Sequence, residues 1–365
     1  MRIMIMASGD LWAGAEVMIY TLVRGFSVHS NVSLRIILLN ENRLAQELRK
    51  LGFDVVVIEE SRHSFLGLVK AVRHAVAAFS PDIIHSHRYK ENLLALFASW
   101  PKKNIKRVAT QHGLPEVTGE GLGYIPQCRN WFFFRLLSLF FDRTILVSDE
   151  MRQRLIGSYG FSFKNTAVIH NGIDIPENIN DRSTEKIIIG SAGRLFPVKD
   201  FGLFVDIACV LAAQNRLFHF VIAGDGPERK MLQEKIRERG LQERFELPGH
   251  QDDMFSFYKK LDVYVNTSTH EGIPMTALEA MSHGIPVVAP YVGGFPEIIV
   301  DGECGHLVGQ RDASLFAEKI FELVCPAQRK KMAIAARHRA KEFFSQKSMA
   351  EKYLQVFDKL LTGAV

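Results

Sequence analysis

The chain has 365 residues, of which 47% are hydrophobic and 23% charged, and its formal net charge is +5 at pH 7. This composition is typical of a soluble globular protein and excludes a disordered or fibrous chain, while the length favours two domains that each bury a core. The four cysteines form no C-x-x-C pair, which argues against a zinc knuckle, a redox motif or a disulfide framework.

The first residues, MRIMIMASGDLW, contain only a short apolar run after one arginine, so we expect no signal peptide and a cytoplasmic protein. The aromatic run WFFFRLLSLFF, residues 131–141, includes Arg135 and has about half the length of a membrane span. We therefore expect it not to cross a bilayer, although it could lie at a membrane interface.

Short aliphatic runs alternate with stretches of helical period through the first half of the chain. The expected strands are residues 2–7, 34–39, 54–59, 81–87 and 106–112, with two more around 144–151 and 166–174. The expected helices between them include residues 15–26, 43–52, 65–79 and 91–100. This alternation is typical of βαβ units and a buried parallel sheet.

Residues 176–186, PENINDRSTEK, are polar, contain proline and lack any period, as a linker should. The alternation of strands and helices restarts after them. The sequence therefore predicts an α/β chain of two doubly wound, Rossmann-like domains, one of residues 1–176 and one of residues 177–346. An amphipathic helix is expected over residues 347–365.

The two halves differ in charge. Residues 1–175 carry 21 Lys and Arg against 15 Asp and Glu, a net +6, whereas residues 176–365 carry 24 against 25, a net −1. A basic domain beside a neutral one suits an anionic partner such as a membrane surface. An ordinary solvated surface is the alternative.

Two cations follow the expected strand IIIGSAG of the second half. Arg194 and Lys199, in GRLFPVKD, flank a turn at the carboxyl end of that strand, where open α/β sheets bind ligands. They suit a diphosphate, since a charge-assisted hydrogen bond contributes about 1.5–3 kcal/mol, although they could also be a pair of surface-loop cations. Gly224, in GDGP after the next strand, either lets a ligand approach or forms a plain turn. The chain has neither G-x-G-x-x-G nor a P-loop motif, which disfavours a dinucleotide site.

The stretch EGIPMTALEAMSHGIPVVA, residues 271–289, holds two glutamates eight residues apart. Glu271 is expected in a loop at the carboxyl edge of the sheet, and Glu279 on a helix with Pro274 at its first position. They are therefore not a close carboxylate pair of the kind that retaining glycosidases use. The helix N-terminus between them can bind an anion that Gly272 lets approach, so the layout suits a diphosphate flanked by two polyols. The alternative is a helix cap at Glu271 and a solvated Glu279.

These motifs together resemble a known family. E-x7-E in the stretch above, with GRLFPVKD, GDGP, HNGID, GAE near the start and GGFPEIIVDGECGHLV, is similar to the retaining glycosyltransferases of the GT-B fold, family 4. The similarity spans nearly the whole chain in the family's order. It implies two Rossmann-like domains facing a central cleft, the nucleotide-sugar donor bound mainly by the second and the acceptor mainly by the first. It also implies that the final helix packs back on the first domain.

The resemblance implies roles for single residues. Arg194 and Lys199 would neutralise the donor diphosphate, Glu279 would hold the ribose hydroxyls, and Glu271 would contact the transferred sugar. His112, in VATQHG, matches a histidine near the anomeric centre, with a capping or core histidine as the alternative. The other matching positions, which would lie against the donor, are Gly14, Gly224, Gly272, Ile273, Met275 and Thr276.

The first loop departs from the family pattern. The family often has Gly-Gly-Ala-Glu, while this chain has Ala13-Gly14-Ala15-Glu16, and a methyl group at position 13 would narrow the approach to a phosphate. His85 and His87 have the spacing of a metal pair but no accompanying acidic cluster. Since the family needs no metal, we expect neither a metal nor a cofactor besides the donor substrate.

The implied reaction moves a hexosyl or N-acetylhexosaminyl group from a nucleotide sugar, most often a UDP-sugar in this family, to a glycan or lipid-linked acceptor. Cell-envelope polysaccharide or lipopolysaccharide synthesis is the expected setting. The aromatic run and the cations Lys102, Lys103, Lys106 and Arg107 suggest an anionic membrane surface as a partner, at the inner face of the cytoplasmic membrane. No nucleic-acid partner is expected. The alternatives are a nucleotide-sugar 2-epimerase of the same fold and a non-catalytic GT-B binding scaffold.

Overall fold

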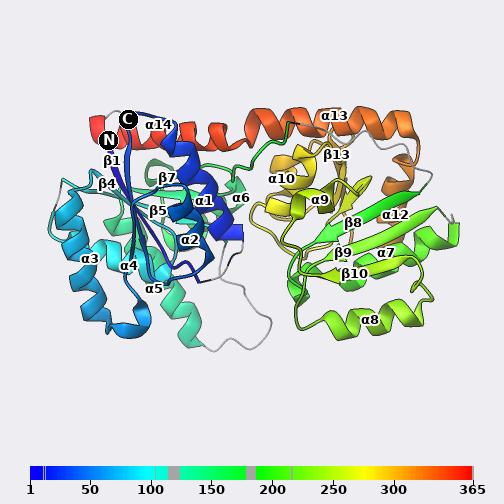
Figure 1. The fold of residues 1–365 in the computed structure, drawn as a ribbon, viewed down its shortest axis with the longest axis horizontal. Helices are drawn as coiled ribbons and strands as arrows, with labels where there is room; N and C mark the ends of the chain where they lie inside the picture. Colours follow the sequence, from blue (N-terminus) through cyan, green and yellow to red (C-terminus); the bar gives the residue numbers. More distant parts are fainter. Residues whose placement is uncertain are drawn as a thin grey trace. The chain divides into compact units, whose positions relative to one another are not determined.

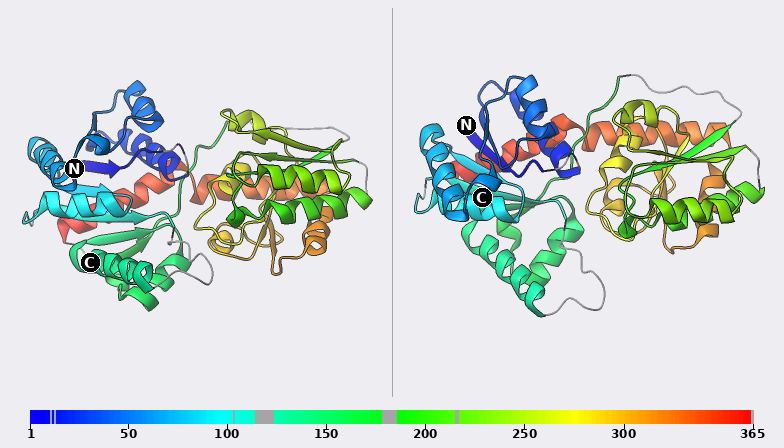
Figure 2. Two further views of the ribbon diagram at one scale, coloured as in Figure 1. Left: turned by 90° about the horizontal axis from the view of Figure 1, so that it is seen from below. Right: turned by 60° about the horizontal axis from the view of Figure 1, so that its bottom comes forward.

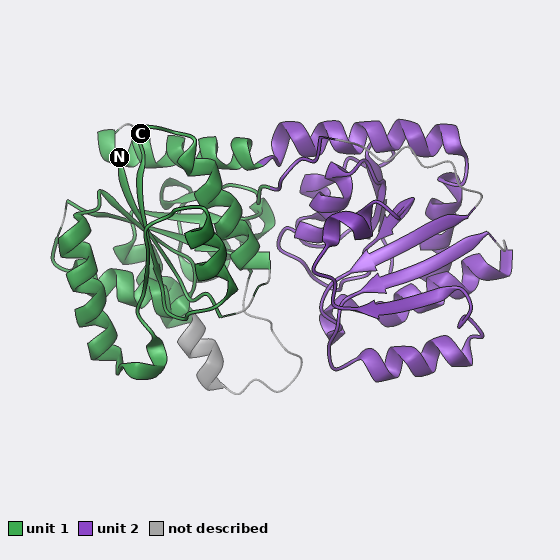
Figure 3. Ribbon diagram, viewed as in Figure 1, with its two compact units in different colours: residues 1–172, 346–365 green, residues 173–345 purple. Residues whose placement is uncertain are grey.

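The structure is a computed structural model that describes residues 1–10, 12, 14–102, 104–113, 124–177, 186–214 and 217–363, without the side chains of 124–130. Ala13, Lys103 and most of the expected linker therefore lie outside the described residues. The chain divides into two compact units (Figure 3). Unit 1 comprises Met1–Gly172 and Gln346–Val365, and unit 2 comprises Ile173–Ser345.

The division after Gly172 lies before the expected boundary at residue 176. Ile173 pairs with Ser345 in an isolated bridge, and its backbone N–H donates to the Phe344 carbonyl at 2.8 Å. These bonds attach the segment from Ile173 onward to unit 2.

Unit 1 is built on a seven-stranded parallel sheet in the order β3-β2-β1-β4-β5-β6-β7 (Figure 1). The strands are β1 (Arg2–Ala7), β2 (Ser33–Leu38), β3 (Val55–Val57), β4 (Ile83–Ser86), β5 (Lys106–Gln111), β6 (Arg143–Leu146) and β7 (Thr166–Val168). The order extends in one direction from β1 and in the other from β4, so the sheet is doubly wound. Strands such as β1 and β4 are almost completely buried because helices cover both faces of the sheet.

The helices of unit 1 form two groups. They are α1 (Gly14–Ser27), α2 (Arg43–Lys50), α3 (Phe65–Phe79), α4 (Tyr89–Ser99), α5 (Tyr124–Phe140), α6 (Asp149–Tyr159) and α14 (Gln346–Thr362), with the 3-10 turns η1 (Glu60–Arg62) and η2 (Phe163–Asn165). Helix α1 packs with α2 and α14, whereas α3, α4, α5 and α6 pack in series. Right-handed crossovers that extend the sheet in opposite directions place these groups on opposite faces, as Figure 2 shows.

Helix α14 returns to unit 1 through a close contact with α1. A Cβ atom added at Gly25 would lie 2.6 Å from the Cβ of Ala350, so glycine permits this approach. On the same face of α14, Tyr353 is buried and its hydroxyl lies 3.0 Å from Thr110 Oγ1 on β5.

Unit 2 repeats the architecture with a six-stranded parallel sheet in the order β10-β9-β8-β11-β12-β13. Its strands are β8 (Ile187–Ala192), β9 (Phe218–Ala223), β10 (Phe245–Gly249), β11 (Val263–Val265), β12 (Val287–Pro290) and β13 (Gly305–Val308). Its helices are α7 (Phe201–Gln214), α8 (Arg229–Glu238), α9 (Met254–Tyr258), α10 (Met275–Ser282), α11 (Phe295–Ile298), α12 (Ala313–Glu322) and α13 (Pro326–Phe343), with the 3-10 turn η3 (Pro197–Lys199). The predicted class, α/β with two doubly wound Rossmann-like domains, is confirmed.

The aromatic run at residues 131–141 lies on and just after α5. Phe133, Phe134, Leu137 and Phe141 are buried, while Trp131, Phe132, Leu139 and Phe140 are exposed. Within the described ranges, we find no helix whose length and apolar character would suffice to cross a membrane.

Candidate active site

The polar loops of unit 2 gather where its strand order reverses, between β8 and β11. The segment after β8 carries Arg194 and η3, and the segment after β11 carries Glu271 and leads into α10. In open α/β sheets, ligands bind outside the carboxyl ends of the strands at this reversal. The sheet topology therefore brings the predicted cations and the Glu271 loop to one edge.

Lys199 and Glu271 form an ion pair at this edge. The ammonium Nζ lies 2.5 Å from Oε1 of the carboxylate, and both side chains are largely buried, with 22% and 14% of their surface exposed. Ser268 Oγ donates a second hydrogen bond to the same oxygen at 2.7 Å. The loops after β8 and β11 are thus joined by opposite charges, and the Lys199 cation is partly neutralised.

Arg194 differs from Lys199 because it is exposed. Its guanidinium stacks on the ring of Phe196, with Cζ 5.0 Å from the ring centroid. In the part of the chain that the structure describes, no carboxylate pairs with Arg194. Its charge is therefore available to an incoming anion.

The Glu271 loop is supported by two glycines from the segment after β12. A Cβ atom at Gly293, whose φ is +55°, would lie 1.9 Å from the carbonyl oxygen of Glu271. A Cβ atom at Gly294 would lie 2.1 Å from the carbonyl oxygen of Gly272. The Gly294 N–H donates to that same oxygen at 2.9 Å. Only glycines allow this close contact, which holds the backbone of the Glu271 loop against the segment after β12.

Gly224 also has a packing reason to be glycine. Its φ is +141°, and a Cβ atom there would lie 1.9 Å from the carbonyl oxygen of Gly193, just after β8. The close approach that Gly224 permits is thus first of all between the ends of β8 and β9.

Helix α10 begins at Met275, one residue later than predicted, because Pro274 has an extended ψ of 108° and precedes the helix. Tyr264 on β11 holds the first turn. Its hydroxyl lies 2.8 Å from Thr276 Oγ1 and 3.2 Å from the Ala192 carbonyl at the end of β8. The amino end of α10, with Gly272, Ile273, Met275 and Thr276 around it, is therefore attached to the strand edge.

Glu279 lies on α10 and Glu271 in the loop before it, as the sequence predicted. The Tyr258 hydroxyl of α9 donates to Glu279 Oε2 at 2.7 Å. Burial raises the pKa of Glu279 to about 7, although the hydrogen bond from Tyr258 opposes the rise. This carboxyl group therefore changes charge near neutral pH.

His112 follows β5 in unit 1 and meets two histidines from β4 and the residue after it. His112 Nε2 lies 3.0 Å from His87 Nδ1, and the His85 and His87 rings are 4.2 Å apart between centroids. Burial, and to a lesser extent the charge of Arg88, lowers the pKa of His112 to about 3. The ring is neutral at physiological pH and can act as a hydrogen-bonding group but not as a cation.

The other expected residue of unit 1, Gly14, is the first residue of α1. Glu16 in the same turn is buried, and its Oε1 lies 2.6 Å from Nη2 of Arg88. Arg88 Nη1 also donates to Ser8 Oγ at 3.0 Å. Arg88 was not among the residues predicted from the sequence, although its place directly after a predicted strand was a usable signal.

Other residues were also missed. The residues that hold the predicted ones in place are Tyr258, Tyr264, Gly293 and Gly294. Of these, only the two glycines belonged to a motif, GGFPE, identified in the sequence.

Among the described residues, we find no group of three or more His, Cys, Asp or Glu that could hold a metal ion.

Two family models match the chain. The model of Glycosyltransferase Family 4 matches residues 12–177, and that of Glycosyl transferases group 1 matches residues 174–339.

Two curated relatives show the same similarity. An uncharacterized glycosyltransferase of Methanocaldococcus jannaschii is 29% identical over 249 residues, 67% of this chain and 65% of that protein. The amylovoran biosynthesis glycosyltransferase AmsD of Erwinia amylovora is 29% identical over 205 residues, 53% of this chain and 56% of its own length. The matched segments thus span less than two thirds of each relative.

The fold also matches a solved structure over nearly its whole length. The structure of Anabaena HepE in complex with UDP aligns with a TM-score of 0.84 at 20% identity, covering 98% of this chain and 100% of that one. The two family models together match residues 12–339, one over most of the first parallel sheet and the other over the second. The chain therefore belongs to the GT-B glycosyltransferases of the family 4 type.

Proposed function

We propose that this protein is a retaining glycosyltransferase that moves a hexosyl or N-acetylhexosaminyl group from a UDP-sugar to a glycan or lipid-linked acceptor. The observation that carries the proposal is the edge of unit 2, where Arg194, the Lys199–Glu271 pair and the amino end of α10 come from adjacent loops. Cations and a helix amino end together attract a diphosphate. In this proposal unit 2 binds the donor and unit 1 the acceptor.

Glu279 supports a nucleotide sugar over a simple phosphate. Its carboxyl group lies about one turn along α10 from the amino end, so it can accept hydrogen bonds from ribose hydroxyls while the helix end faces the diphosphate. The UDP in the HepE structure favours uridine as the base.

The Lys199–Glu271 pair suggests how the donor is received. A diphosphate would compete with Glu271 for the ammonium group of Lys199. As Lys199 turns to the phosphate, the Glu271 carboxylate becomes free to accept a hydroxyl of the transferred sugar. Donor binding would thus replace one ion pair by another, while Ser268 and the sugar hydroxyl keep the Glu271 carboxylate hydrogen-bonded.

The chemical step is a front-face substitution with retention. The bond from the anomeric carbon to the phosphate oxygen breaks, a bond to the acceptor oxygen forms on the same face, and the departing phosphate takes the acceptor's proton. Negative charge grows on the diphosphate as it leaves, so Arg194 and Lys199 would stabilise the transition state more than the bound donor. His112, being neutral, would contribute only hydrogen bonds near the anomeric carbon.

The proposed acceptor is a cell-envelope polysaccharide, since another relative is the Vi polysaccharide biosynthesis protein VipC/TviE of Salmonella typhi. Lipopolysaccharide or another lipid-linked glycan, and a place at the inner face of the cytoplasmic membrane, belong to the same proposal. The basic excess of residues 1–175 supports this placement.

The test is incubation of the protein with UDP-, GDP- and ADP-sugars, with and without a glycan acceptor mixture. We expect slow nucleotide release from one UDP-sugar that accelerates with acceptor, and a product whose anomeric proton coupling matches that of the donor. Isomerised free donor would indicate a 2-epimerase, and neither release nor isomerisation would indicate a binding scaffold. A product of opposite anomeric configuration would overturn the retaining mechanism.

A further inference from the structure

Helix α3 has a second apolar stripe that faces away from the sheet. Leu68, Val72, Val76 and Phe79 are buried against the unit 1 core. On the opposite side, Phe65 is 40% exposed and Leu66 is 78% exposed. Apolar side chains are normally confined to the buried side of such a helix, so the outer stripe calls for a partner.

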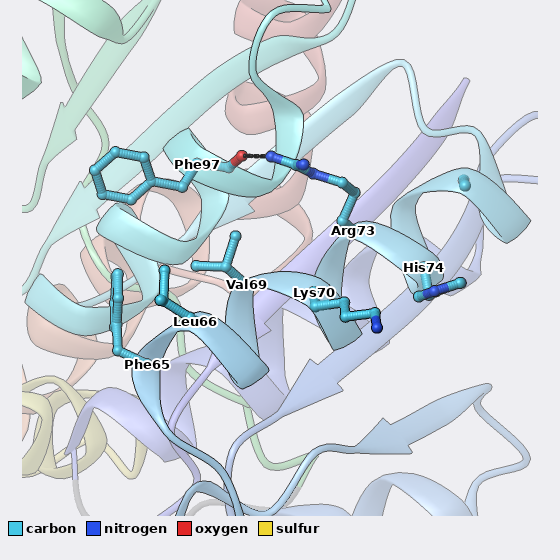
Figure 4. A pocket seen from close by; sticks show the side chains of 8 residues that line it. Phe65, Leu66, Val69, Lys70, Arg73, His74 and Phe97 are labelled. Atoms are coloured by element: carbon cyan, nitrogen blue, oxygen red, sulfur yellow. Dashed lines mark hydrogen bonds between the residues drawn. The ribbon is translucent and has the colours of Figure 1, made fainter.

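The outer stripe forms one wall of a groove with a volume of about 770 Å³ between α3 and α4 (Figure 4). Phe65, Leu66, Val69 and Phe97 line its apolar part, and Lys70 and His74 extend beside its other part. Arg73 joins the two walls, because its guanidinium donates to the Phe97 carbonyl at 2.9 Å. We call this feature the α3–α4 groove.

Exposed aromatic rings continue from the groove toward α5. The rings of Phe65 and Phe97 pack edge to face with centroids 6.0 Å apart, and those of Trp100 and Phe140 do so at 5.8 Å. All four side chains are at least 40% exposed. Phe97 and Trp100 lie three residues apart at the end of α4, so the rings form one apolar surface across three helices.

The same segment holds the whole basic excess of the first half of the chain. Residues 65–140 carry 10 Lys and Arg against 4 Asp and Glu, while the rest of residues 1–175 carries 11 of each. Two of the four acidic residues are described: Asp82 accepts a hydrogen bond from the Arg2 backbone, and Glu91 is buried. Three of the ten cations, Arg88, Lys90 and Lys106, are paired with carboxylates outside this segment, whereas Lys70 and Arg73 line the groove.

From these observations we propose that the α3–α4 groove and the adjoining aromatic surface dock on an anionic phospholipid membrane. Exposed aromatic and aliphatic side chains can enter the headgroup region, while lysine and arginine keep their charges at the anionic lipid phosphates. Trp100, which belongs to the aromatic surface, and Trp131 on α5 are both exposed, as expected at a membrane interface. The proposal deepens the membrane placement in the proposed function and moves its centre from residues 131–141, which are half buried, to α3 and α4.

The test uses flotation of the full chain with vesicles of phosphatidylcholine, with and without phosphatidylglycerol. We expect binding to the anionic vesicles at low salt and release as the salt concentration rises. The double variant Leu66→Ser with Lys70→Glu removes one apolar and one cationic contact from the groove. It should lower the partition coefficient by about tenfold or more.

The matched control is Ile334→Ser with Lys331→Glu on α13, which makes the same chemical changes at exposed positions of unit 2. It should bind vesicles like the unchanged protein. UDP-induced thermal stabilisation, measured on every variant, reports the proposed donor site separately and should stay the same. Absence of vesicle binding at low salt, or equal binding by the groove variant and the control, would overturn the proposal. Self-association that depends on Leu66 would also overturn it, by assigning the groove to a second copy of the chain.

Discussion

Units 1 and 2 share a doubly wound topology but place different chemistry where their strand order reverses. At the edge of unit 2, Arg194 is exposed and Lys199 is held by one carboxylate that a ligand could replace. At the edge of unit 1, the histidines are neutral through burial and Arg88 is bound to the buried Glu16. The comparison shows that topology provides a polar edge, whereas the loops decide whether its charges are available to a ligand.

The net charges of the two halves of the chain show the reverse contrast, because the first half is the more basic one. Unit 1, whose strand edge has few available charges, has its basic excess in residues 65–140, the segment from α3 to α5. The second half of the chain is close to neutral. Long-range attraction to an anionic surface would thus act on unit 1, and short-range attraction to a diphosphate on unit 2.

The largest expected effect comes from removing the available cation of unit 2. Arg194→Ala should lower turnover by about a hundredfold to a thousandfold, because the leaving diphosphate loses a charge-assisted hydrogen bond. Thermal stability should change little, since the side chain is exposed and stacks on the exposed ring of Phe196. The measurement is the initial rate of UDP release with acceptor.

Arg237→Ala is the matched control for Arg194→Ala, because it removes the same charge from an exposed position on α8. Its turnover should stay near that of the unchanged protein. If both variants lose activity equally, the effect belongs to the net charge of unit 2 and the proposed role of Arg194 is wrong.

A smaller loss is expected from disturbing the support of the Glu271 loop. In Gly294→Ala the new Cβ atom would lie 2.1 Å from the Gly272 carbonyl oxygen and 2.4 Å from Ile273 Cδ1, so the loop must move. A displacement of this kind should lower turnover by about tenfold to a hundredfold. Gly309→Ala, where no atom lies within 4 Å of the new Cβ, is the control. Equal turnover in the two variants would show that the glycine contact does not position Glu271.

Much of the fold was predictable from the sequence because its strands are buried on both faces. Runs such as RIMIMA and KIIIGSAG are rich in apolar residues and alternate with stretches of helical period, which is typical of parallel sheets. The placement of Glu271 in a loop and Glu279 on a helix was also predictable, since proline marks the start of α10. These signals are local in sequence.

The rest of the candidate site depends on contacts between distant segments. Arg88 and Glu16 are 72 residues apart, and Tyr258 meets Glu279 across two elements. The loss of charge on His112 depends on burial beside β4, which no local pattern reports. Likewise, the run at 131–141 indicates an apolar helix but not which of its sides is exposed.

In unit 1, Glu91 lies in the first turn of α4 and is buried. Burial raises the pKa of its carboxyl group to about 7. The folded protein therefore favours the protonated form, and the stability contributed by this group is complete below the unfolded pKa and lost as the pH rises through 7. Glu91→Gln supplies a neutral isostere. It should raise the free energy of unfolding at pH 8 by about 2–3 kcal/mol and change it little at pH 4.5.

Urea unfolding at the two pH values measures this effect. Glu351→Gln on α14 is the control, since the side chain is 46% exposed and its ion pair with Lys347 is long, at 3.9 Å. It should leave the pH dependence unchanged. A gain from Glu91→Gln that is equal at both pH values would show that burial of charge is not its cause.

The smallest expected effect is the pH dependence of donor binding in unit 2. Because burial raises the pKa of Glu279 to about 7, part of the protein holds a protonated Glu279 at neutral pH, and that form cannot accept two ribose hydroxyls. The affinity for UDP-glucose, whose diphosphate is esterified at both ends and does not titrate here, should rise about tenfold between pH 6 and pH 8. Tyr258→Phe removes the hydrogen bond that favours the carboxylate, so the midpoint should move to higher pH. Tyr264→Phe, which loses a hydrogen bond to Thr276 instead, should leave the midpoint in place. The measurement is calorimetric titration at each pH. If Glu279→Gln and the unchanged protein give the same pH profile, another group titrates. The charge of Glu279 would then play no part in donor binding by unit 2.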